Sequence, residues 1–256
     1  MAEPEVDRIV ARTWVERWDR QQERYIADRE ERFRVIGDVV AHVCRDVAAP
    51  VVADLGCGPG SLTTRLHERL PSARVVGVDV DPLLLALARA TRPDGAAVEY
   101  VRAELGSPGW VDALGVGAKW DAAVSTTALH WLDPERLAGV YADLATVLRP
   151  GGVFVNGDHL PDEQPAVREL AVVVRDRRAE RAGVVDNEEW AAWWTGVRAD
   201  PDLAEVLTPD ELRGTSSGHG NGLSARWHRE ALLRAGFGEV GVLWQAGDDH
   251  VLVAVR

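Results

Sequence analysis

Residues 51–60 read Val-Val-Ala-Asp-Leu-Gly-Cys-Gly-Pro-Gly, an apolar run that ends in a glycine-rich turn. A short apolar run bounded by turn residues predicts a buried strand. Gly56, Gly58 and Gly60 allow the backbone to turn sharply and to approach a ligand closely, because glycine tolerates positive φ. A helix is expected directly afterwards, over residues 62–70, and its first N–H groups favour an anionic ligand. The stretch therefore predicts a strand, a ligand-binding turn and a helix.

Strands and helices alternate downstream of this turn. The pattern predicts an α/β fold, a doubly wound and mostly parallel sheet of seven strands that ends in an antiparallel hairpin. Two helices are expected within residues 7–47, ahead of the first strand. The expected strands are 51–55, 74–79, 98–101, 121–125, 153–155, 240–244 and 251–255, and the expected later helices are 62–70, 83–90, 134–148, 161–182 and 227–235.

Composition narrows the class of protein. The formal net charge of −12 is unfavourable for binding a polyanion, so the composition disfavours a nucleic-acid partner. No apolar run approaches the ~18 residues of a membrane span, and no signal-peptide core follows the acidic N-terminus. The two cysteines, Cys44 and Cys57, cannot form a disulfide framework. We expect a cytoplasmic globular protein without a membrane partner, and the sequence leaves its oligomeric state open.

Further motifs stand at the ends of the expected strands. The segment Val76-Gly-Val-Asp79 ends the second strand, and Arg102-Ala-Glu-Leu105 follows the third. Residues 120–131 read Trp-Asp-Ala-Ala-Val-Ser-Thr-Thr-Ala-Leu-His-Trp, and residues 148–154 read Leu-Arg-Pro-Gly-Gly-Val-Phe. Together with residues 51–60, this ordered set resembles the motifs of the class I S-adenosylmethionine-dependent methyltransferases over residues 50–157.

The resemblance implies a cofactor, S-adenosylmethionine, with S-adenosylhomocysteine as its product. The glycine-rich turn faces the methionine end of the cofactor in that family, and Asp79 stands where a carboxylate accepts both ribose hydroxyls. Glu104 stands where the family commonly has an aspartate near the adenine amino group. The implied cofactor-binding residues are Tyr25, Arg29, Asp54, Gly56, Cys57, Gly58, Gly60, Asp79, Val80, Glu104, Leu105 and Thr126.

The resemblance also divides the chain into three parts. Residues 49–159 and 224–256 form the Rossmann-like domain that binds S-adenosylmethionine. Residues 1–48 are expected as an N-terminal helical lid, with a purely structural helix pair as the alternative. Residues 160–223 are expected as a helical cap over the acceptor site.

The acceptor pocket is expected at the carboxyl ends of the fourth and fifth strands. His130 and His159 follow these strands, and either could serve as a base, because histidine has a pKa near neutrality. Packing or loop roles remain open for both. The expected substrate-contacting residues are Trp131, Trp190, Trp194 and His219, although the tryptophans also suit the buried face of a cap helix. The spacing of histidines and acids predicts no metal site.

Three other classes of protein share part of this sequence pattern. The G-x-G-x-x-G fingerprint of nicotinamide oxidoreductases needs a third glycine where Ser61 or Thr63 stands. A nucleic-acid methyltransferase shares the fold, but its amino-methylating members carry two prolines after strand four, where residues 125–128 read Ser-Thr-Thr-Ala. A scaffold that binds a nucleotide without catalysis remains open. The sequence favours methyl transfer to O, N or C of a small molecule, with a secondary metabolite as our expectation.

Overall fold

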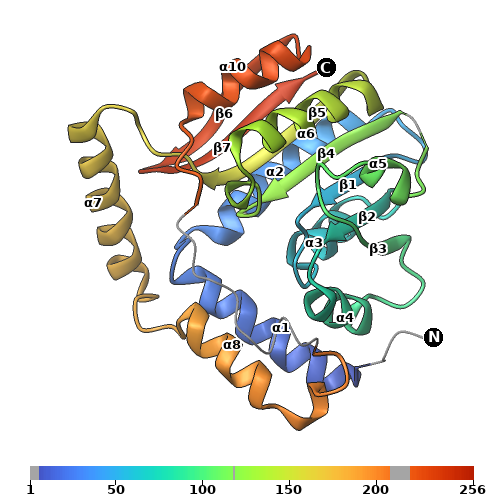
Figure 1. The fold of residues 1–256 in the computed structure, drawn as a ribbon, viewed down its shortest axis with the longest axis vertical. Helices are drawn as coiled ribbons and strands as arrows, with labels where there is room; N and C mark the ends of the chain where they lie inside the picture. The colour runs from blue at the N-terminus through green and yellow to red at the C-terminus, as the bar shows by residue number, and fades with distance from the viewer. Residues whose placement is uncertain (1–5, 118, 208–219) are drawn as a thin grey trace.

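The computed structural model describes residues 6–117, 119–207 and 220–256. A seven-stranded sheet lies at its centre, in the order β3-β2-β1-β4-β5-β7-β6 (Figure 1). The strands are β1 (Val51–Leu55), β2 (Arg74–Asp79), β3 (Val98–Arg102), β4 (Trp120–Thr126), β5 (Leu148–His159), β6 (Glu239–Ala246) and β7 (Asp249–Val255).

Helices precede, connect and follow these strands. They are α1 (Arg8–Glu23), α2 (Arg29–Cys44), α3 (Ser61–Arg69), α4 (Pro82–Thr91), α5 (Trp110–Ala113), α6 (Pro134–Val147), α7 (Pro165–Ala182), α8 (Trp190–Ala199) and α10 (Ala225–Ala235), with short 3₁₀ helices η1 (Leu129–Trp131) and η2 (Pro201–Leu203).

The pairing of the strands confirms the predicted fold. Strands β1 to β5 run parallel, whereas β7 pairs antiparallel with both β5 and β6. The chain order reverses at β1, which lies between β2 and β4. Ligands of open parallel sheets bind at such a reversal, outside the carboxyl ends of the strands. This topology places the motifs of strands one, two and four around a single crevice.

Apolar side chains cover both faces of the sheet. Phe33 and Ile36 of α2 and Leu62 of α3 pack on one face, together with side chains of α4. Leu137 of α6 and Leu232 of α10 belong to the core on the other face. A separate apolar cluster joins α1, α4 and α8, which lie next to one another near the bottom of Figure 1. The N-terminal helices are therefore built into the body of the protein.

Strand β5 is longer than the sequence pattern predicts. It begins at Leu148, immediately after α6, instead of at Val153. Two contacts accompany the extension: Leu148 pairs with Trp120 of β4, and Gly151 and Gly152 exchange hydrogen bonds of 2.6 Å and 2.9 Å with the backbone of Arg256. Both contacts join segments that are distant in the chain.

Helix α7 stands at the side of the molecule (Figure 1). Val167, Leu170, Ala171 and Val174 recur at helical spacing along α7 and so share one face of it. In the structure, Val167, Leu170 and Val174 are 42%, 65% and 49% exposed, so the described residues leave this apolar face uncovered. Within the described part of the chain, no helix combines the length and the hydrophobicity needed to cross a membrane.

Candidate active site

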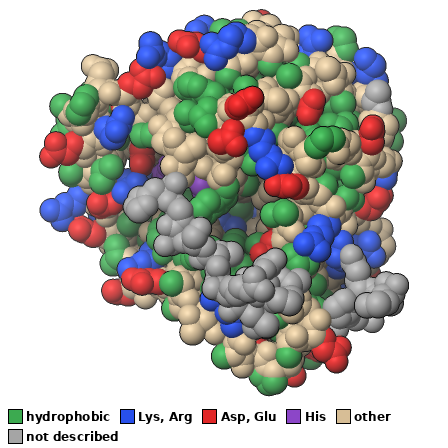
Figure 2. Space-filling view, in the orientation of Figure 1, with side chains coloured by type: hydrophobic (Ala, Val, Ile, Leu, Met, Phe, Trp, Pro, Cys, Tyr) green, Lys and Arg blue, Asp and Glu red, His purple; other side chains and the backbone are tan. Residues whose placement is uncertain are grey.

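A cavity of about 760 Å³ opens at the carboxyl ends of β1, β2 and β4. Figure 2 shows a hollow on this face of the molecule, with histidine side chains visible within it. The cavity is lined by Trp18, Gln22, Tyr25, Ile26, Arg29, Gly56, Cys57, Gly58, Pro59, Ser61, Leu62, Asp79, Val80, Asp81, Leu84, Thr126, Thr127, Ala128, His130, Trp131, His159, Trp190 and Trp194. Its volume suits small organic ligands.

The glycine-rich turn forms one wall of the cavity. Gly56, Gly58 and Gly60 have φ values of 70°, 54° and 86°, which other residues rarely adopt. A Cβ at Gly56 would lie 2.3 Å from the Ala128 Cβ, and one at Gly60 would lie 2.4 Å from the Tyr100 hydroxyl. Two of these glycines are therefore required for packing as well as for backbone conformation.

Asp79 closes β2 directly beside this turn. Its Oδ2 accepts a hydrogen bond of 2.8 Å from the Gly58 N–H, and its Oδ1 accepts one of 2.9 Å from the Asp81 N–H. These two bonds fix the plane of the carboxylate, while each oxygen keeps a lone pair for a further donor. A pair of vicinal hydroxyls, such as those of a ribose, fits that arrangement. Asp81 caps α4 by accepting from the Leu84 N–H at 2.9 Å.

Asp54 lies beneath the turn and does not line the cavity. Its Oδ2 accepts a hydrogen bond of 2.6 Å from the Thr63 hydroxyl. Complete burial raises the pKa of Asp54 to about 7, even though the Thr63 hydroxyl acts in the opposite direction. Asp54 thus ties β1 to α3 and holds the turn from below.

The N-terminal helices form the wall opposite the turn. The Trp18 ring of α1 approaches Gly58, because a Cβ there would lie 3.8 Å from the ring. The Tyr25 hydroxyl accepts a hydrogen bond of 3.1 Å from the Trp190 N–H, which joins this wall to α8. Arg29 and Tyr25 both line the cavity.

The Arg29 guanidinium is buried beside the N-terminus of α3. It donates to Asp19 at 2.7 Å, and the same carboxylate accepts from the Ser61 hydroxyl at 2.5 Å. Burial lowers the pKa of Arg29, although Asp19 partly offsets this effect. The guanidinium nevertheless remains a cation, because the arginine pKa is so high. Arg29 and the first N–H groups of α3 together make this end of the cavity attractive to a carboxylate.

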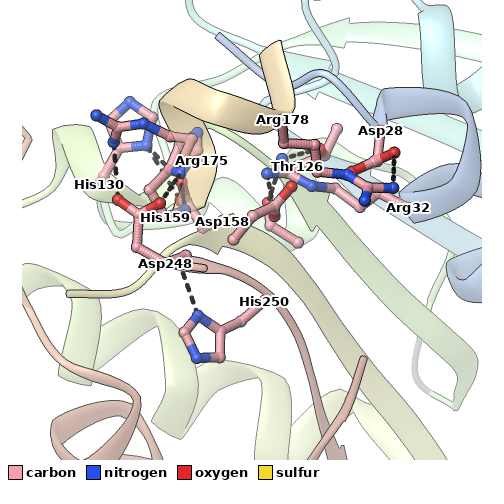
Figure 3. Close-up of polar contacts among 12 residues, drawn as sticks. Asp28, Arg32, Thr126, His130, Asp158, His159, Arg175, Arg178, Asp248 and His250 are labelled. Carbon is pink, nitrogen blue, oxygen red and sulfur yellow. Dashed lines mark hydrogen bonds and ion pairs between the residues drawn. The ribbon is translucent and has the colours of Figure 1, made fainter. Parts of the chain in front are cut away.

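The partly exposed His130 pairs with the buried Asp158 at the other end of the cavity (Figure 3). The His130 Nδ1 lies 2.9 Å and 3.1 Å from the two oxygens of Asp158. Burial opposes protonation of the ring, but the attraction of Asp158 outweighs it, so the pKa of His130 lies above its ordinary value. The pKa of Asp158 is lowered, because His130 and Arg32 together outweigh its own burial. This geometry leaves the His130 Nε2 for a ligand.

Arg32 supports this pair from behind and is fully buried. It donates a 3.3 Å hydrogen bond to the Thr126 hydroxyl (Figure 3). It donates another of 3.3 Å to the Gly157 carbonyl, and it forms an ion pair with Asp249. A Cβ at Gly157 would lie 2.7 Å from the Arg32 side chain, so glycine is needed there. One side chain of α2 therefore holds together the ends of β4, β5 and β7.

His159 faces the cavity from the end of β5. Its Nδ1 lies 3.4 Å from Asp248, and Arg175 of α7 donates to the same carboxylate at 2.8 Å. Arg178 of α7 pairs with Asp28, immediately before α2 (Figure 3). The arginines Arg175 and Arg178 are therefore bound to acids of the protein itself.

Aromatic rings complete the cavity. Trp190 and Trp194 of α8 line it with ring centroids 5.7 Å apart, and Trp194 is also buried in the cluster between α1, α4 and α8. Trp131 stands beside His130 with 53% of its surface exposed. Trp194 therefore packs within that cluster and also lines the cavity, whereas Trp131 is mainly an exposed surface of the cavity.

The structure brings most, but not all, of the expected site residues together. Glu104 and Leu105 do not line the cavity: Glu104 is bound to Arg136 at 2.7 Å on the surface, and Leu105 is part of the core. Gly60 caps α3 next to the cavity. His219 lies outside the described residues.

Sequence reasoning missed Trp18, Arg32 and the partnership of Asp158. Trp18 carried a signal, since it stands one helical turn after Trp14 in a segment expected to be a lid. Asp158 also carried a signal, because it follows the strand predicted over residues 153–155, whose carboxyl end was expected beside the acceptor pocket with that of the strand before His130. The sequence carried no signal for Arg32, because its partners are separated from it by 94 to 217 residues.

Comparison with known proteins agrees with this geometry. A methyltransferase-domain family model matches residues 52–152. The chain is 31% identical over 209 residues to trans-aconitate 2-methyltransferase of Methylobacterium nodulans, which covers 77% of this chain and 74% of that protein. It is 43% identical over 137 residues to the enzyme of the same name from Azoarcus sp. (strain BH72), covering 54% of this chain and about half, 49%, of that relative.

A solved methyltransferase structure has a similar fold. Magnesium protoporphyrin IX methyltransferase from Synechocystis PCC 6803, solved with bound S-adenosylhomocysteine, superposes with a TM-score of 0.52 at 17% identity, over 88% of this chain and 82% of that one. The motifs, the cavity, the sheet and the relatives agree, and the chain belongs to the class I S-adenosylmethionine-dependent methyltransferases.

Proposed function

We propose that this protein transfers the methyl group of S-adenosylmethionine to a carboxylate oxygen of a small molecule. The observation that carries the proposal is the His130–Asp158 pair, which faces the cavity from the ends of β4 and β5. The relatives named trans-aconitate 2-methyltransferase support it, because their names specify a small carboxylate-bearing acceptor.

The residues of the cavity fit the cofactor. Asp79 would accept the ribose hydroxyls, and the glycine-rich turn leaves room for the backbone to contact the methionine part. Arg29 and the N-terminus of α3 would bind the methionine carboxylate. When bound, S-adenosylmethionine supplies a methyl group already activated on a sulfonium, so the protein mainly aligns the acceptor and excludes water.

His130 would hold the acceptor in line with the methyl group. Hydrogen bonding to Asp158 fixes the ring through Nδ1 and leaves the Nε2–H of the imidazolium to donate to one carboxylate oxygen. The other oxygen is then free to attack. The raised pKa of His130 favours this role, because the imidazolium persists to higher pH and is lost only as the pH rises through that pKa. A carboxylate acceptor itself needs no base.

A hydroxyl acceptor is the second candidate. The hydrogen bond from Nδ1–H to Asp158 also selects the neutral tautomer with a lone pair on Nε2, which suits a general base. A hydroxyl acceptor would need that base, so its methylation would rise with pH through the pKa of His130. Methylation of a carboxylate would instead fall. The pH dependence separates the two candidates.

The net charge and the two free cysteines support a small-molecule acceptor and a cytoplasmic location. A net charge of −12 favours a small-molecule acceptor over a nucleic acid. Cys44 and Cys57 are both free, which suits a reducing cytoplasm. Conversion of an acceptor would distinguish an enzyme from a scaffold that only binds the cofactor.

Calorimetry tests the cofactor site. We expect S-adenosylhomocysteine to bind in the micromolar range and NAD to give no heat. Asp79→Ala should weaken binding about 10- to 1,000-fold, since hydrogen bonds to a charged group contribute about 1.5–3 kcal/mol each and water replaces part of the loss. Glu104→Ala is the matched carboxylate control, because Glu104 is bound to Arg136 outside the cavity. Heat from NAD alone, or an Asp79→Ala variant within about twofold of wild type, would contradict this placement.

A further inference from the structure

We propose that Asn221, with the adjacent Gly220, is a positioning residue that holds His130 against Asp158. Both residues lie in the segment that leads into α10, far from His130 in the chain, and neither belongs to the described cavity lining. This inference rests on the proposed function, because it identifies what holds the histidine that would align the acceptor.

The turn that carries His130 is short. It is the 3₁₀ helix η1, which has three residues. Within it, the Trp131 N–H donates to the Ala128 carbonyl at 3.2 Å, and the Leu132 N–H donates to the Leu129 carbonyl at 3.1 Å. A turn of this length lacks the repeated hydrogen bonds of an α-helix, so its orientation depends on contacts from other segments.

Asn221 supplies such contacts to the backbone of the turn. Its N–H donates to the His130 carbonyl at 2.8 Å. Its Nδ2 donates to the Leu129 and Leu132 carbonyls at 3.3 Å and 2.9 Å. Its Oδ1 accepts a hydrogen bond of 3.1 Å from the Leu223 N–H, which fixes the amide. Asparagine suits this position because its amide both donates and accepts, and one side chain thereby binds both ends of the turn.

Gly220 packs its backbone against the His130 side chain. A Cβ at Gly220 would lie 3.1 Å from the His130 Cβ and 3.3 Å from both Cγ and Cδ2 of the ring. A single added methyl group would therefore press on the imidazole. The Nδ1 edge of the same ring lies 2.9 Å from Asp158. Gly220 and Asp158 thus contact different edges of the ring and together restrict its orientation.

This placement of the ring also determines its charge. Asp158 of β5 raises the pKa of His130, whereas burial and the Arg32 guanidinium of α2 act in the opposite direction. His159 is the other titratable side chain that lines this end of the cavity (Figure 3). The attraction to Asp158 weakens with distance. A turn that is no longer bound by Asn221 would let the ring move away from Asp158, and the pKa of His130 would fall.

Histidine side-chain resonances followed against pH by NMR test the inference, in the protein without acceptor or cofactor. The His130 signal is identified by its loss in His130→Gln. We expect Asn221→Ala to move the His130 titration to lower pH. Asn187→Ala is the matched control, because the Asn187 Nδ2 also donates to a backbone carbonyl, that of Arg20, at 2.8 Å. A His130 titration in Asn221→Ala that coincides with wild type, or an equal shift in Asn187→Ala, would overturn the inference.

A double-mutant cycle shows whether the effect passes through Asp158. In an Asp158→Asn background, Asn221→Ala should cause little further shift, because the carboxylate from which the ring is displaced has already been removed. Equal shifts with and without that carboxylate would contradict a positioning role. Asn221→Ser, whose shorter side chain cannot reach both ends of the turn, gives the same readout if Asn221→Ala does not fold.

Methyl transfer gives the functional readout, with trans-aconitate as the carboxylate probe. Asn221→Ala and Gly220→Ala should each lower kcat about 10- to 100-fold, because a small displacement of an aligning group is costly. Their affinity for S-adenosylhomocysteine should stay within about twofold of wild type. Gly139→Ala on α6 is the control for an added methyl group, because a Cβ there meets no described atom within 4 Å. Wild-type kcat in both Asn221→Ala and Gly220→Ala would count against the inference.

The two readouts separate this inference from the proposed function. If Asn221→Ala shifts the titration while His130→Ala keeps the wild-type rate, Asn221 positions His130 but the proposed role of His130 is wrong. If the wild-type protein does not methylate the probe, the titration alone decides the inference. If the titration does not move, the inference is wrong whatever the acceptor.

Discussion

Asp158 determines what its neighbour His130 can do. The carboxylate lies 2.9 Å from the ring and raises its pKa against the effect of burial. Asp158→Asn should therefore lower the pKa of His130, because it removes a close opposite charge that stabilises the imidazolium. With a carboxylate acceptor, activity is present below that pKa and lost above it, so the loss should move to lower pH.

The pH profile of kcat/KM measures this shift. Asp112→Asn serves as the control, since Asp112 is an exposed residue of α5. A profile in Asp158→Asn that coincides with the wild-type profile would mean that His130 does not act through its charge.

At the scale of elements, α1 and α2 carry one wall of the cavity. Trp18, Tyr25 and Arg29 line it, and Tyr25 also accepts a hydrogen bond from α8. We propose that this wall acts as a lid, which a bound cofactor holds closed. Hydrogen exchange in residues 10–32 should slow when S-adenosylhomocysteine is added, because contacts to the ligand stabilise the closed state.

Helix α6 provides the reference for this measurement, because its residues lie outside the cavity lining. Equal exchange in residues 10–32 with and without ligand would favour the alternative, a helix pair with a purely structural role. The cluster that α1 forms with α4 and α8 already shows that the wall has such a role in part.

At the scale of the whole molecule, the sequence predicted those features of the fold and the site that short local patterns determine. The alternation of strands and helices, the glycine-rich turn and the position of Asp79 beside it follow from short segments, and the sheet order confirms the fold. The chain could also be assigned to its family from these motifs alone. Residues at strand ends were found for the same reason, because parallel strands present them at one edge.

The features of the site that the sequence did not predict depend on side-chain contacts between residues far apart in the chain. Glu104 stands where the family has a carboxylate near the adenine. In the structure, however, Arg136, 32 residues further along the chain, binds its carboxylate at the surface. The pairing of Thr126 with Gly157 brings Asp158 to His130, and that register depends on β4 and β5 lying side by side. Arg32 and Asp249 meet only in the folded protein. Side-chain partners of this kind leave no periodic signal in a sequence.

The rate of methyl transfer in His130→Ala, measured beside the affinity for S-adenosylhomocysteine, tests the central claim most directly. His159→Ala is the companion variant, because His159 faces the same cavity but is paired with Asp248. We predict that His130→Ala lowers kcat by about 100-fold or more with cofactor affinity intact, while His159→Ala has a smaller effect. Retention of kcat within about threefold in His130→Ala would contradict the account, since the acceptor would then be positioned without this residue.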